Sequence, residues 1–132
     1  MPILNLTLSG TPDPALSARA AATLSDITAK ILHKSASHTS ITVGYHPADH
    51  WFVAGASLDA QSKTSFFLDI LVSAESNTNR EKAAYISAVF TAMGTLLGEL
   101  HPISYVHVHD ASPGTWGYSG AIQKHRFVAA TI

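Results

Sequence analysis

The sequence predicts an α/β fold in which two consecutive β-α-β units form one four-stranded sheet with two helices on one face. Three observations predict it: the chain repeats itself, each half contains one amphipathic helix pattern, and the helices follow the short apolar segments 4–8 and 66–72. A strand–helix–strand unit places its two strands in parallel through a right-handed crossover. With both helices on one face, the other face is bare, so we expect another copy of the chain to cover it.

Four blocks of the first half recur in the same order in the second half. Two are strand-like segments that align at a shift of 64 residues, and two are single residues that align after one further inserted residue. The aligned pairs are 4–10 with 68–74, 40–46 with 104–110, Trp51 with Trp116, and Gly55 with Gly120. We therefore expect a single domain over residues 1–132, with repeats at 2–60 and 65–124 joined by a polar linker at 61–65.

Each half carries recognisable helix boundaries. Asp13 is suited to an N-cap and Pro14 to the first helical position, where its missing N–H costs nothing. Thr78 and Glu81 have the spacing of a capping box, and Gly98 favours a helix end. The apolar stripes are Leu16, Ala20, Leu24, Ile27 and Ile31 in the first helix, and Ile86, Val89, Phe90, Met93, Leu96 and Leu97 in the second. These stripes match at a shift nearer 66 than 64.

The composition excludes several classes of function. Eight Lys and Arg residues stand against nine Asp and Glu, a formal net charge of −1, which argues against a nucleic-acid partner or an anionic membrane surface. The chain has no cysteine, so disulfides and thiolate chemistry are excluded. Only 13% of residues are charged and 46% are apolar, which favours burial against other subunits. With no signal-peptide pattern and no apolar run of about 20 residues, we expect a cytoplasmic protein with no membrane partner.

Pro2 is the residue that could supply the most unusual reactive group in the chain. If the initiator methionine is removed, Pro2 carries a free secondary amine at the tip of the first strand. Burial in an apolar pocket would disfavour the charged form of that amine and lower its pKa. A neutral amine near pH 7 is a general base, or a nucleophile toward a carbonyl carbon.

The opening Met1-Pro2-Ile3, the doubled β-α-β unit and the chain length together resemble the tautomerase superfamily. The similarity is to its long two-unit members, related to macrophage migration inhibitory factor, malonate semialdehyde decarboxylase and cis-3-chloroacrylic acid dehalogenase. The segment 105–110 resembles the fifth strand of the inhibitory factor, and 116–120 resembles the turn after it. The resemblance implies a homotrimer with pockets between neighbouring subunits, an amino-terminal proline as catalytic base, and no cofactor.

The resemblance also implies further site residues. Tyr105 falls on a pocket tyrosine and His107 on a pocket asparagine, and both face the same side of a strand, so they join Pro2 as catalytic candidates. The candidates for substrate binding are Lys34, near a substrate-binding lysine, the aromatic residues Trp51, Phe52 and Trp116 as apolar walls, and Arg126 from a neighbouring tail.

Arginine is missing where related enzymes use it. The positions of two substrate-gripping arginines of 4-oxalocrotonate tautomerase fall on Thr42 and Thr11, and the segment 72–76 contains none. Arginine grips a carboxylate with two parallel hydrogen bonds. Its absence argues against dicarboxylate tautomerisation, hydrolytic dehalogenation and decarboxylation by the known schemes. A carboxylate would then rely on Lys34, His107, backbone N–H groups or Arg126.

The function predicted is keto–enol proton transfer by an isomerase, a tautomerase, acting on a small 2-oxo acid, with Pro2 as the base. Tyr105 or His107 would donate a hydrogen bond to the enolate oxygen. Two alternatives stay open: a catalytically weak trimeric binding module on the same scaffold, and a lyase or hydratase acting on a small unsaturated acid. The eight histidines include pairs but no complete ligand set, so we expect no metal site.

Overall fold

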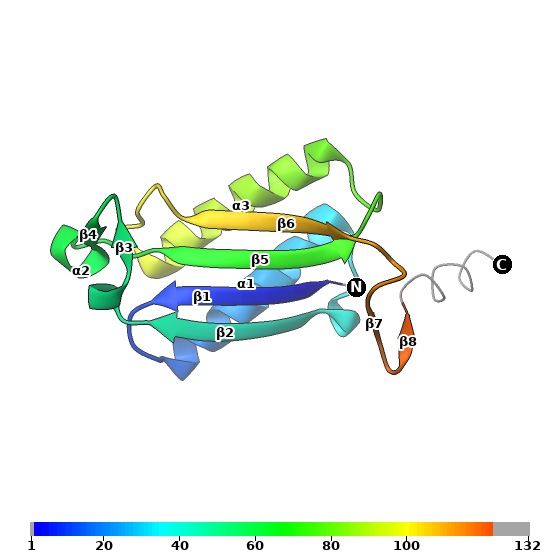
Figure 1. Cartoon of the computed structure of the whole chain (residues 1–132), viewed down its shortest axis with the longest axis horizontal. Coiled ribbons are helices and arrows are strands. Elements are labelled where there is room, and N and C mark those ends of the chain that lie inside the picture. Colours follow the sequence, from blue (N-terminus) through cyan, green and yellow to red (C-terminus); the bar gives the residue numbers. More distant parts are fainter. Residues whose placement is uncertain (1, 123–132) are drawn as a thin grey trace.

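The computed structural model describes residues 2–122. Two long helices and one four-stranded sheet make up most of this part, and two short hairpins lie at its ends (Figure 1). The main elements are β1 (Ile3–Ser9), α1 (Pro14–Leu32), β2 (Ser40–His46), β5 (Phe66–Ser73), α3 (Asn79–Leu97) and β6 (Tyr105–Ala111). The smaller ones are η1 (Ala36–His38), η2 (Ala48–His50), β3 (Phe52–Val53), β4 (Ala56–Ser57), α2 (Leu58–Gln61), β7 (Gly117–Tyr118) and β8 (Ala121–Ile122).

The four-stranded sheet is built from two parallel pairs joined back to back. Its strand order is β2-β1-β5-β6, in which β1 and β2 are parallel, β5 and β6 are parallel, and the central strands β1 and β5 are antiparallel. Each parallel pair is one β-α-β unit, so the predicted architecture is confirmed. Because the central strands are antiparallel, the start of β1 lies beside the end of β5, with Ile3 opposite Leu71.

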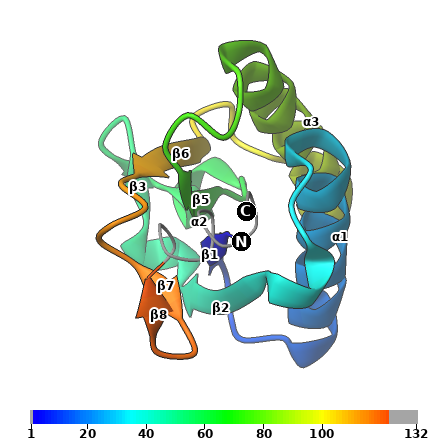
Figure 2. The same cartoon turned by 90° about the vertical axis from the view of Figure 1, so that its right-hand side faces the viewer.

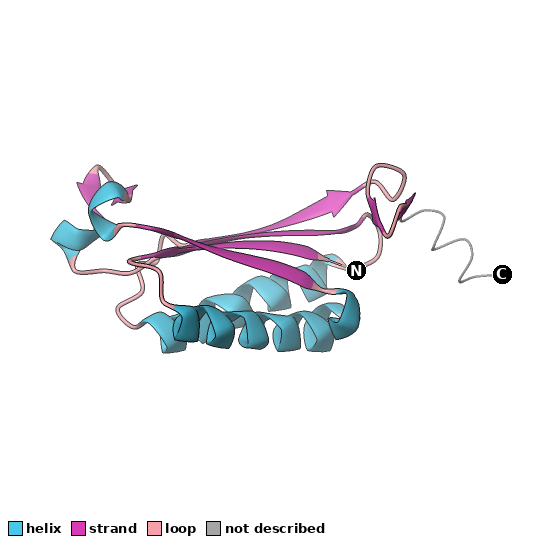
Figure 3. Cartoon of the chain, turned by 90° about the horizontal axis from the view of Figure 1, so that it is seen from below, coloured by secondary structure: helices cyan, strands magenta, loops and turns pink. Residues whose placement is uncertain are grey.

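Both long helices cover the same face of the sheet, and the opposite face is left bare (Figure 3). Alternate residues of β1 and β5 point to the helices, as the period of two requires, and form the core with both helices. The buried members are Leu4, Leu6, Leu8, Ala20, Leu24, Leu32, Phe66, Leu68, Ile70, Val72, Tyr85, Val89 and Met93. Within residues 2–122, neither long helix is apolar enough to span a bilayer.

The helix boundaries follow the sequence signals. The Asp13 carboxylate accepts hydrogen bonds from the backbone N–H groups of Ala15 and Leu16, and Pro14 begins α1. Thr78 and Glu81 form the predicted capping box, and Gly98 caps the end of α3. The predicted α3 stripe is wrong at two positions, because Ile86 and Phe90 are exposed while Tyr85 lies in the core.

The structure corrects the internal alignment by one residue. The shift is 64 between β1 and β5 but 65 between the helices α1 and α3, between β2 and β6, and between the end hairpins. The predicted match of 40–46 with 104–110 is therefore one residue early, since β6 spans Tyr105–Ala111. The extra residue lies in the loop between β5 and α3. The helix shift nearer 66 is also wrong, and the polar linker at 61–65 begins inside α2.

Candidate functional site

Pro2 is buried and lines a cavity of about 260 Å³ at one end of the sheet. This cavity, the Pro2 cavity, is lined by Pro2, Ile3, His38, Ser40, Trp116, Gly117 and Tyr118. Figures 1 and 2 show the hairpin of β7 and β8 at the end of the sheet where β1 begins. Residues from both halves of the chain therefore meet here.

Three parts of the fold position the side chains of the Pro2 cavity. Because β1 and β2 run parallel, their starts lie together, and the Ser40 N–H donates to the Pro2 carbonyl oxygen at 3.4 Å. The short helix η1 places His38 just before β2. The β7–β8 hairpin follows β6 and brings Trp116 and Tyr118 across the end of the sheet, with the rings of His38 and Tyr118 5.3 Å apart.

The Pro2 cavity contains no Asp, Glu, Lys or Arg side chain among its described lining residues. One of its lining residues carries an unusual donor: within residues 2–122, the indole nitrogen Nε1 of Trp116 is buried without a hydrogen-bond partner. A buried donor left unpaired costs about 1–3 kcal/mol. A ligand with an acceptor oxygen beside this nitrogen would remove that cost. Such a cavity suits a small molecule with an apolar body and a few oxygen atoms.

The other two catalytic candidates lie on the bare face of β6. Tyr105 is 61% exposed and pairs in register with Phe67, which pairs with Thr7. Thr7 is five residues from Pro2, about 17 Å along an extended strand. His107 also faces outward, and its Nδ1 lies 3.1 Å from an Asp69 carboxylate oxygen. Within one chain, neither side chain lines the Pro2 cavity.

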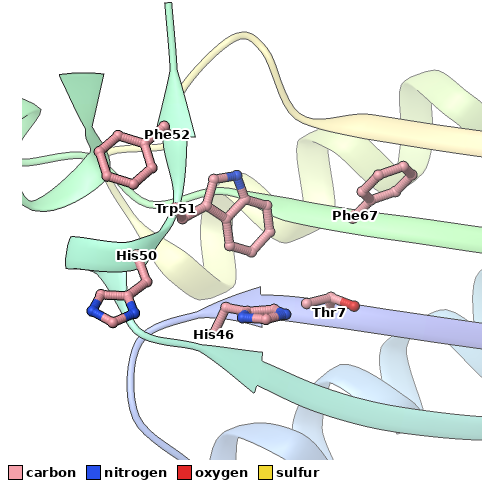
Figure 4. Close-up of a pocket in the computed structure, with 6 residues that line it drawn as sticks. All are labelled: Thr7, His46, His50, Trp51, Phe52 and Phe67. Atoms are coloured by element: carbon pink, nitrogen blue, oxygen red, sulfur yellow. The ribbon is translucent and has the colours of Figure 1, made fainter. Parts of the chain in front are cut away.

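Trp51 and Phe52 lie at the end of the sheet opposite Pro2. Figure 4 shows the Trp51 indole between Phe52 and Phe67, in a hollow of about 300 Å³ that His46 and His50 also line. Of the aromatic walls predicted from the sequence, the structure places only Trp116 beside Pro2 within one chain.

Lys34 does not line the Pro2 cavity. The half-buried Lys34 ammonium donates to the Ser76 hydroxyl at 2.9 Å. Burial lowers the pKa of Lys34, and the nearby Glu81 carboxylate opposes that shift. Arg126 lies outside the described residues.

The sequence interpretation missed His38, Ser40 and Tyr118 as cavity residues. A signal for the first two was available, because the start of a parallel partner strand must lie beside the start of β1. The position of Tyr118 depends on how the hairpin after β6 folds back, which no local pattern indicates.

Comparisons with known proteins agree with this architecture. No protein-family model and no curated protein matches the chain in sequence. Among solved structures, a wild-type fused 4-OT that forms a symmetric trimer aligns with a TM-score of 0.80 at 20% identity, over 92% of this chain and 96% of its own. A macrophage migration inhibitory factor-like protein from Entamoeba histolytica aligns with a TM-score of 0.76 at 16% identity, over 92% and 97%.

A third solved structure extends the likeness to another activity. FG41 malonate semialdehyde decarboxylase, inhibited by 3-bromopropiolate, aligns with a TM-score of 0.74 at 11% identity, over 98% of this chain and 97% of its own. Proteins with different chemistries therefore share this arrangement of strands and helices. The chain has the tautomerase-superfamily fold.

Proposed function

We propose that the chain is a cofactor-independent enzyme in which the Pro2 amine is the general base for keto–enol proton transfer on a small 2-oxo acid. The observation that carries the proposal is the burial of Pro2 in a cavity whose described lining has no Asp, Glu, Lys or Arg side chain. Burial penalises the charged form of an amine. A neutral Pro2 nitrogen can then accept a proton once Met1 has been removed.

The proposed reaction moves one proton and no other group. The Pro2 nitrogen takes a proton from the carbon next to the substrate carbonyl, and the electron pair of that C–H bond forms the enolate. The protonated amine then returns the proton to the enolate oxygen, which gives the enol, and ketonisation is the reverse. One positioned acid–base group contributes roughly 10²–10⁴-fold.

Hydrogen-bond donors for the substrate oxygens come from two places in this proposal. The Trp116 indole N–H, buried without a partner among the described residues, is assigned to a substrate oxygen in the Pro2 cavity. Tyr105 and His107 lie on the bare face, so they reach that cavity only from a neighbouring copy. A homotrimer provides such a neighbour, and the likeness to a fused 4-OT that forms a symmetric trimer supports it.

The test compares wild type with Pro2→Ala on the tautomerisation of phenylpyruvate, followed by the loss of enol absorbance. We expect Pro2→Ala to lose at least 100-fold in kcat/KM. Pro12→Ala is the matched control, since Pro12 is exposed in the loop before α1. The intact mass of the active protein should lack Met1. Equal rates for Pro2→Ala and wild type would contradict the proposal and favour the binding module.

A further inference from the structure

At the end of the sheet opposite Pro2, a further cavity adjoins the hollow of His46 and His50, and the two share Trp51, Phe52 and Phe67. Its volume is about 300 Å³, similar to that of the Pro2 cavity, and it opens between β3, the start of β5 and the start of β6. We call it the distal cavity. It is lined by Trp51, Phe52, Val53, Ala54, Ser65, Phe66, Phe67, Ile103 and Tyr105.

The distal cavity is the internal repeat of the Pro2 cavity. Under the shift of 64 residues for β1 and 65 elsewhere, every described residue that lines the Pro2 cavity has its counterpart in the lining of the distal cavity. The pairs are Pro2 with Phe66, Ile3 with Phe67, His38 with Ile103, Ser40 with Tyr105, Trp116 with Trp51, Gly117 with Phe52, and Tyr118 with Val53.

The backbone confirms that this is a structural equivalence. The hairpin over the distal cavity turns through Ala54 and Gly55, with φ of 55° and 81°. The hairpin over the Pro2 cavity turns through the equivalent Ser119 and Gly120, with φ of 52° and 76°. Two consecutive residues of positive φ are typical of a tight β-hairpin turn. Both ends of the sheet are therefore closed in the same way.

The two cavities differ in chemistry. In the distal cavity a phenyl ring stands in the place of the proline, Ile103 replaces the imidazole of His38, and Val53 replaces the phenol of Tyr118. The described lining offers no amine base and no charged side chain. Phe52, Phe67, Ile103 and Tyr105 nevertheless leave large apolar surfaces exposed there. Exposed apolar surface gathered around a hollow is typical of a binding site.

We infer that the distal cavity is a non-catalytic site for a small, uncharged aromatic molecule. The aromatic rings of Trp51, Phe52 and Phe67 provide faces and edges against which a planar ligand packs. The described lining of the distal cavity has no counterpart of the Pro2 amine or the His38 imidazole, which disfavours the 2-oxo acid proposed for the Pro2 cavity. The inference rests on the repeat and not on proton transfer at Pro2, so it stands or falls independently of the proposed function.

The two tryptophans of the chain allow a direct test, because each cavity contains one of them. In a ¹H–¹⁵N spectrum the indole N–H of Trp116 reports the Pro2 cavity, and that of Trp51 reports the distal cavity and the adjoining hollow of His46 and His50, which the Ile103 variants below tell apart. The signals are assigned with Trp51→Phe and Trp116→Phe. Titration with 2-naphthol, an uncharged two-ring probe, should move the Trp51 signal saturably at concentrations that leave the Trp116 signal in place. Phenylpyruvate, the substrate used above, should move the Trp116 signal.

A matched pair of variants tests the position of the site. Ile103→Glu places a carboxylate in the distal cavity and should weaken 2-naphthol binding at least tenfold. Ile86→Glu makes the same change at a similarly exposed isoleucine on α3 and should leave the affinity unchanged. If Ile103→Glu does not fold, Ile103→Ser serves in its place, with a weaker affinity again expected.

Several outcomes would overturn the inference. The inference fails if the Trp51 signal does not move with 2-naphthol, or if 2-naphthol binds with equal affinity at both tryptophans. It also fails if an Ile103 variant binds 2-naphthol as tightly as wild type does. If a second copy of the chain occupies the distal cavity instead, the Trp51 signal should change on dilution of the protein and not with 2-naphthol. If the Trp51 signal does not respond to 2-naphthol but the Trp116 signal responds to phenylpyruvate, the distal site is refuted and the proposed function at Pro2 is not.

Discussion

The phenol of Tyr85 in α3 donates a hydrogen bond to the hydroxyl of Thr28 in α1, over 2.8 Å. The direction is fixed because the Thr28 hydroxyl gives its own proton to the Leu24 carbonyl oxygen at 2.7 Å. Both side chains are fully buried. This pair joins the two β-α-β units through the only helix layer of the described chain.

Tyr85→Phe should lower the free energy of unfolding by about 1 kcal/mol, the net value of a typical hydrogen bond. The ring remains, so no cavity forms, and urea denaturation measures the loss. A double-mutant cycle with Thr28→Val isolates the pair. Strict additivity of the two single changes would show that the hydroxyls do not interact.

Stability should fall at alkaline pH because of the same tyrosine. Burial raises the pKa of Tyr85 from its usual 10 to about 12, and the Thr28 hydroxyl, which can turn to donate a hydrogen bond to the phenolate, opposes part of that shift. Between these pH values the unfolded chain releases a proton that the folded chain retains, so the free energy of unfolding decreases as pH rises. Tyr85→Phe should show a smaller decrease over this range. Equal pH slopes for the two proteins would refute the assignment.

A second pH effect is expected on the acid side. The pKa of Glu81 is lowered chiefly by the backbone N–H of Thr78, which donates to the carboxylate at 2.8 Å, and also by the Asn77 side chain. As pH falls below about 4.5, the Glu81 carboxylate is therefore protonated in the unfolded chain before it is protonated in the folded chain. The free energy of unfolding decreases as pH falls, until the folded carboxylate is protonated as well. Glu81→Gln keeps an acceptor in the capping box but cannot titrate, so its urea midpoint should change less with pH there. A slope as steep as that of wild type would contradict this.

Complementation tests whether Tyr105 acts across a subunit boundary. Pro2→Ala and Tyr105→Phe should each be impaired alone, but unfolding and refolding them together should restore activity. In randomly mixed closed trimers about a quarter of the sites would pair an intact Pro2 with an intact Tyr105 of a neighbour. The two variants mixed without refolding serve as the control. If joint refolding restores no activity, Pro2 and Tyr105 of neighbouring chains do not act in the same site.

The bare face should be the surface through which copies of the chain associate. Leu71 lies on this face, in register with Ile3 and His109. Leu71→Glu should raise the dissociation constant of the oligomer at least 100-fold, because an unpaired buried charge costs about 3–5 kcal/mol. Ile86→Glu, which adds the same charge on the helix side, should leave the dissociation constant unchanged. Sedimentation measures both, and an unchanged mass for Leu71→Glu would place the interface elsewhere.

The local elements could be predicted because their signals are short in range. The N-cap at Asp13, the capping box of Thr78 and Glu81, and the helix end at Gly98 each depend on residues within a few positions. The stripe of α3 was less well predicted, since Ile86 and Phe90 have the right spacing and chemistry but face solvent. Which apolar face of a helix is buried depends on the neighbouring helix as well as on the period.

The sequence by itself determined two β-α-β units, one bare sheet face and a proline at the tip of the first strand. Only the tertiary structure decided that Trp116 lies beside Pro2 while Trp51 lies at the other end of the sheet. The reason is the antiparallel pairing of β1 with β5, which places the end of the second unit at the start of the first. Strand order is set by packing across the whole sheet, and no local pattern in the chain encodes it.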